Sequence, residues 1–74
     1  MDIHKCREEM KKLHRSHLEE IASVVMPVDL VPDAAKNRQD LINAIIHYTS
    51  ADLAKRLDRL RIAIDNAKDS SALP

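Results

Sequence analysis

The group Cys6, His14 and His17 near the N-terminus consists of side-chain types that bind zinc. Most zinc sites use three or four protein ligands, with thiolate and imidazole preferred. On a continuous helix Cys6 and His17 point in similar directions but lie about 16 Å apart along the axis, too far to share one ion. His14 and His17 could share a metal, but no Cys-x-x-Cys or His-Glu-x-x-His pattern supplies further ligands. We therefore predict neither a metal site nor a bound cofactor.

His17 has a second interpretation, because it falls in the apolar row of the helix expected at the N-terminus. A polar side chain in such a row can fix the register of packed helices or make their association depend on pH. Alternatively, Leu18 takes the core position and His17 lies at its margin. Ser16 does not form a nucleophile and base pair with His17, because neighbours on a helix point about 100° apart. We predict no catalytic residue and therefore no enzyme.

A local excess of positive charge follows later in the chain, at Lys55, Arg56 and Arg59. Their spacing places them along one flank of a helix, where they could contact phosphates or an acidic groove of a protein. The alternative is a solvated flank of mixed charge that helps to choose a helical partner. Over the whole chain 12 basic and 12 acidic side chains cancel, and nucleic-acid binding normally needs a basic excess. Nucleic acid is therefore possible but not favoured.

Helices must position these side chains. Residues 50–69 contain a helical seam with spacings of four and three, formed by Leu53, Leu57, Leu60, Ile64 and Ala67. Residues 2–26 are predicted to form another long helix, which begins at Asp2 and must end before Pro27. Its apolar row contains Ile3, Cys6, Met10, Leu13, His17 and Val24, with Ile21 beside it.

A shorter helix is expected between the two long ones. Residues 27–32 have a proline at each end, which predicts an extended connector, and Asp33 is a good N-cap for a helix that reaches about Tyr48. One continuous helix over residues 33–69 is possible, but the apolar stripe changes phase near Thr49 and Ser50, which favours a break there. Residues 70–74 show no periodicity and are predicted to be a disordered tail.

Composition limits both the core and the possible functions. The chain has 74 residues, one Cys, no Gly, no Phe and no Trp, and Tyr48 is its one aromatic residue. The absence of glycine excludes Gly-rich phosphate loops. A core without large aromatic side chains gives marginal stability at this length, so we expect a homodimer or a docked partner. No apolar run reaches 18 residues and no signal peptide is evident, so we expect a cytoplasmic protein with no membrane partner.

These observations predict an all-α, three-helix domain over residues 1–69 that forms a helical bundle by self-association. The residues proposed as a partner-binding or dimer seam are Met10, Leu13, His17, Ile21, Leu53, Leu57, Leu60 and Ile64. The function predicted is that of a small non-enzymatic regulatory or adaptor protein that binds another protein through amphipathic helix faces. The alternative is a small DNA- or RNA-binding module that uses the basic flank of the third helix.

Overall fold

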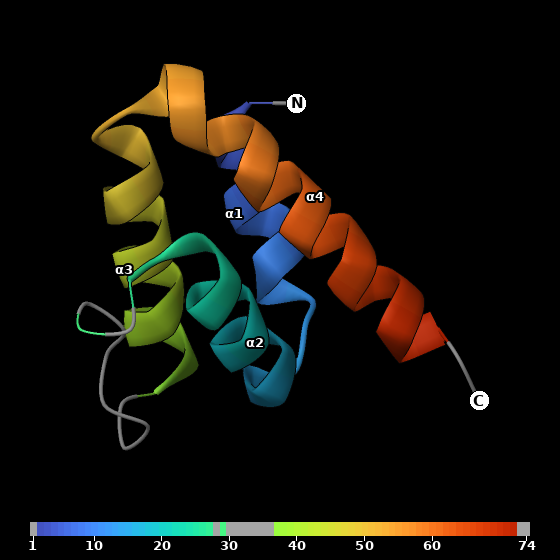
Figure 1. Cartoon of the computed structure of the whole chain (residues 1–74). Helices are drawn as coiled ribbons and strands as arrows, with labels where there is room; N and C mark the ends of the chain where they lie inside the picture. The colour runs from blue at the N-terminus through green and yellow to red at the C-terminus, as the bar shows by residue number, and fades with distance from the viewer. Residues whose placement is uncertain (1, 28, 30–36, 73–74) are drawn as a thin grey trace.

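A computed structural model describes residues 2–27, 29 and 37–72 of the chain. This part folds into four α-helices and contains no strand: α1 (Ile3–Lys11), α2 (Arg15–Val25), α3 (Arg38–Ser50) and α4 (Leu53–Ala72) (Figure 1). The all-α prediction is confirmed, with four helices rather than three. Most of the predicted connector, as well as the helix start predicted at Asp33, lies outside the described residues; α3 is capped by Asn37, whose side chain accepts a hydrogen bond from the Asp40 amide.

The two ends predicted for the N-terminal helical region are confirmed. The side chain of Asp2 caps α1 by accepting a hydrogen bond from the Lys5 amide at 2.9 Å. Met26, which precedes Pro27, has an extended backbone with ψ of 150°, as the residue before a proline prefers, and α2 ends at Val25. The continuous helix predicted between these ends is wrong, because it breaks at residues 12–14.

The break between α1 and α2 is a sharp corner made without glycine or proline. Lys12 still has helical backbone angles, whereas His14 is extended, with ψ of 157°, and starts α2 without a side-chain cap. A straight helix of 25 residues would be roughly 37 Å long, longer than the 35 Å maximum extent of the folded chain. The corner lets both halves pack on the same core.

Arg38, the first residue of α3, stabilises this corner through its side chain. Its Nη2 atom donates to the carbonyl oxygen of Lys11 at 2.6 Å and to that of Leu13 at 2.7 Å. The last carbonyls of a helix have no partner within it, and a glycine with positive φ often turns the chain so that they are satisfied. No described residue of this chain has a positive φ. A charged side chain supplies the donors instead.

The break predicted near Thr49 and Ser50 is confirmed, although these residues close α3 instead of capping α4. The carbonyl of Asp52 accepts the first hydrogen bonds of α4. Arg56 fastens this second corner: its Nη1 atom donates to the carbonyl of Tyr48 at 2.8 Å, and its guanidinium carbon lies 3.9 Å from the centre of the Tyr48 ring. At both of these corners, an arginine side chain therefore donates a hydrogen bond to a carbonyl at the end of the preceding helix.

The core lies where α1 and α2 pack against α3 and α4, and each of the first two helices contacts both of the others (Figure 1). The largest fully buried side chains are aliphatic or methionine, namely Met10, Leu18, Ile21, Leu41, Ile42, Ile45, Leu60 and Ile64. Glu9 and Lys68 join α1 to α4 at the rim through an ion pair of 2.9 Å. The described part of the chain thus builds a core mainly from aliphatic and methionine side chains, without a large aromatic residue. The helix α4 continues to Ala72, three residues past the end predicted for it.

Candidate protein-binding surface

Most of the predicted seam lies inside a single chain. Five of its eight residues are buried in the core: Met10, Leu13, Ile21, Leu60 and Ile64. Leu57 is half-buried against the same core, whereas Leu53 is 44% exposed at the start of α4. The buried members contribute to the stability of the fold, so a surface for a partner must be sought among other residues.

His17 lies at the margin of the core, and Leu18 occupies the core position beside it with no exposed surface. Its ring nitrogen Nδ1 is buried and has no hydrogen-bond partner among the described residues. The ring of His14 lies 6.2 Å away, tilted by 40°. This pair is not part of any group of three or more potential metal ligands in the described ranges.

Cys6 is fully buried in the core, and burial raises the pKa of its thiol. A reactive cysteine needs a lowered pKa and access to solvent. The side chain therefore acts as a small apolar group of the core.

The three residues of the predicted basic flank differ in their exposure. Lys55 and Arg59 are exposed on α4, whereas Arg56 is half-buried and engaged with Tyr48 at the corner. Arg61, further along the helix, pairs with Asp58 at 3.4 Å. Two of the three proposed cations thus remain accessible to an anionic partner.

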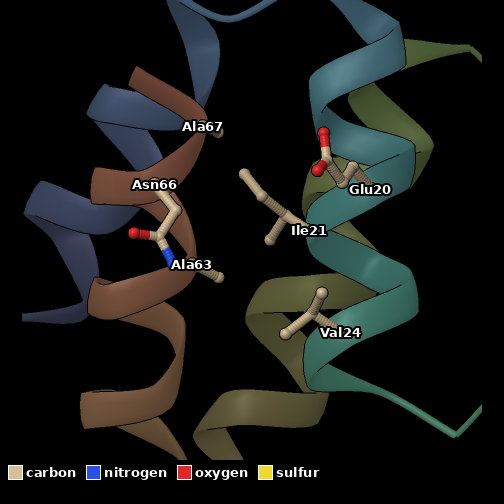
Figure 2. Close-up of a pocket in the computed structure, with 6 residues that line it drawn as sticks. All are labelled: Glu20, Ile21, Val24, Ala63, Asn66 and Ala67. Carbon is tan, nitrogen blue, oxygen red and sulfur yellow. The ribbon is translucent and has the colours of Figure 1, made fainter. Parts of the chain in front are cut away.

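A groove with a volume of about 90 Å³ lies between α2 and α4. Figure 2 shows the residues on its two walls, which are Glu20, Ile21 and Val24 from α2 and Ala63, Asn66 and Ala67 from α4. Ile21 points from α2 across the gap and forms the floor with the two alanines, all three of them buried. Small side chains at two positions four residues apart on α4 leave this space open.

The rim of the groove combines apolar and polar groups. Val24, which the sequence placed in the buried row, is 57% exposed at the edge of the groove, because the corner at residues 12–14 shifts the buried face of α2 to Leu18, Ile21, Ala22 and Val25. The Glu20 carboxylate and the Asn66 amide supply hydrogen-bonding groups at the same rim (Figure 2). In the sequence, the only indication of the groove is the pair of small residues Ala63 and Ala67, four positions apart. This pair predicts a hollow only once α2 is known to pack beside α4.

The volume of the groove decides what it can hold. Pockets for cofactors or drug-sized ligands usually have volumes of about 300–1,000 Å³. The groove is several times smaller, so it is suited to one apolar side chain projecting from a larger partner.

The structure places the chain in the class of small, all-helical domains. No protein-family model matches the chain, and no curated protein or solved structure gives a significant match. Within the described residues, no helix is both long enough and apolar enough to cross a bilayer.

Proposed function

We propose that this protein is a small, non-enzymatic regulator or adaptor that binds another protein through the groove between α2 and α4. The observation that carries the proposal is the exposed Val24 beside an apolar floor made by Ile21, Ala63 and Ala67. Protein interfaces typically have an apolar centre, where anchoring side chains fill pockets, and a polar rim. The groove with Glu20 and Asn66 at its edge has this arrangement.

The partner expected for this groove is a helix or extended segment that presents one aliphatic side chain. Helix-in-groove recognition places apolar anchors of the partner between two helices of the receptor. A donor group next to the anchor would pair with the Glu20 carboxylate, and a donor or acceptor would pair with Asn66. The partner segment is thus predicted to carry a basic or amide side chain close to its apolar anchor.

Crosslinking from the groove tests this proposal. A photoreactive amino acid replaces Val24 in one variant and Glu8 on α1 in another, because both sites are exposed and only the first borders the groove. In an extract of the source cells, the probe at position 24 is expected to give a discrete crosslinked protein that the probe at position 8 does not. Identical crosslinking patterns from the two positions would contradict the proposal.

The competing function, binding of DNA or RNA, would rest on Lys55 and Arg59, since Arg56 is occupied at the corner. Contacts with phosphates make affinity fall steeply with salt. A gel-shift assay at two salt concentrations separates the two functions. Tight, salt-sensitive binding that is lost when both exposed cations are changed to alanine would favour the nucleic-acid function.

A further inference from the structure

The outer face of α4 carries a second row of residues with the spacing of a helical seam. At about 100° per residue the row spans an arc of about 80° on the exposed side of the helix. Its member Asn66 also lies at the rim of the groove between α2 and α4. Its five members are all exposed, and they are Lys55, Arg59, Ile62, Asn66 and Asp69. Ile62, at the centre, is 61% exposed, the highest value among the large apolar side chains described. An aliphatic side chain in this position contributes nothing to the core of the chain.

Charge is ordered along this outer row. It begins with the cations Lys55 and Arg59 and ends with the carboxylate of Asp69. Lys55 and Asp69 are each seven residues from Ile62, or about 10 Å along the helix axis on either side. Neither of them forms an ion pair with another described residue of the chain.

A row that is positive at one end, apolar at its centre and negative at the other end is complementary to itself when reversed. Two copies of α4 that run antiparallel about a two-fold axis at Ile62 bring the two isoleucines together. The same operation places Lys55 of each copy opposite Asp69 of the other, so the ion pair forms twice. A parallel arrangement would instead oppose like charges.

We propose that the outer face of α4 pairs with the same face of a second copy of this chain, in an antiparallel, two-fold dimer centred on Ile62. The pairing goes beyond the proposed function, because it needs neither the groove nor another protein. One apolar side chain per copy makes a small interface of the kind found in weak complexes, with a dissociation constant on the order of 100 µM. The dimer is therefore expected to be concentration-dependent and weakened by salt.

Charge reversal provides a test with an internal rescue. In a dimer of Lys55→Glu, the new carboxylate of each copy faces Asp69 of the other copy. In a dimer of Asp69→Lys, the new ammonium group of each copy faces Lys55 of the other copy. Each variant alone is expected to dimerise at least about tenfold more weakly than the wild type at low salt, since two attractive pairs become repulsive. An equimolar mixture of the two restores both attractive pairs in a heterodimer and is expected to return to wild-type affinity.

Sedimentation equilibrium over a range of protein concentrations provides the measurement. The two substitutions place a negative charge in the first turn of α4 and a positive charge near its end, which favours the helix dipole, so loss of association does not come from unfolding. Lys5→Glu, the same exposed change in the first turn of α1, is the matched control and is expected to dimerise as the wild type does.

Three results would overturn the inference: a wild-type chain that stays monomeric at every concentration, variants that associate as the wild type does, or a mixture no tighter than its components. These results are independent of crosslinking at position 24. A monomer that still captures a partner there refutes the dimer alone, and a dimer without a captured partner refutes the proposed function alone.

Discussion

Replacing Arg38 with methionine removes the side chain that ties the corner between α1 and α2 to the start of α3. The substitution keeps much of the aliphatic length and deletes the donor of the hydrogen bonds to the carbonyls of Lys11 and Leu13. These carbonyls lie where the predicted continuous helix is interrupted. The variant therefore tests whether the contact made by Arg38 stabilises the corner.

The two hydrogen bonds are short, at 2.6 and 2.7 Å, and their donor is charged. Hydrogen bonds to charged groups contribute about 1.5–3 kcal/mol when they are protected from solvent. Arg38 is exposed, although its hydrogen bond to Leu13 is partly buried, so water can replace part of what is lost. We expect the free energy of unfolding to decrease by about 1–2 kcal/mol. This is a large share of the total, which is on the order of 3–5 kcal/mol for a domain of this size.

Urea unfolding followed by circular dichroism measures this loss. With a slope of about 1 kcal/mol per molar urea, the midpoint of Arg38→Met should fall by about 1–2 M. Arg7→Met is the control, because its 3.3 Å hydrogen bond to Asn43 is exposed and should contribute little. Amide exchange at Leu13 should also accelerate in the Arg38 variant. Equal midpoints for the two variants, with unchanged exchange at Leu13, would refute the role assigned to Arg38.

Three further predictions concern single side chains. The hydrogen bond from Lys68 lowers the pKa of Glu9. The ion pair therefore stabilises the fold above pH 4.5, the ordinary pKa of the group, and this stabilisation is lost as the pH falls through the pKa of the folded state. In Glu9→Gln the urea midpoint should decrease less on acidification than in the wild type, whereas Glu8→Gln should behave as the wild type does. The hydroxyl of Thr49 is buried with no hydrogen-bond partner in the described structure, so Thr49→Val should raise stability by about 1 kcal/mol and Thr49→Ser should lower it, as measured by thermal unfolding. Arg56→Met should lower the urea midpoint by about 1 M through loss of its contacts at the end of α3, and a midpoint equal to the wild type would contradict this.

Local chemistry explains why several helix ends were predictable. Asp2 caps a helix through its own side chain, and Pro27 excludes helical geometry at the residue before it, so both signals act within a few residues. The break after α3 was visible because the apolar stripe changes phase near Thr49. These features depend on neighbouring residues and are therefore recorded in the sequence pattern.

The corner between α1 and α2 has no such local signal. Residues 12–14 contain neither glycine nor proline, and the carbonyls exposed by the break are satisfied by Arg38, more than 20 residues away. The error at the corner also explains the error at Val24, since a continuous helix would have placed that side chain in the buried row. The groove was missed for a related reason: its walls come from two helices whose pairing the sequence does not show.

The most direct test of the proposed function combines crosslinking at Val24 with a variant in which the groove is filled. Ala63→Leu adds an aliphatic side chain at the floor of the 90 Å³ groove, and Ala54→Leu adds the same group at an exposed position of α4 outside it. We predict that the partner crosslinked from position 24 is lost with Ala63→Leu and retained with Ala54→Leu, while both variants remain folded. Undiminished crosslinking in the Ala63 variant would contradict binding through this groove.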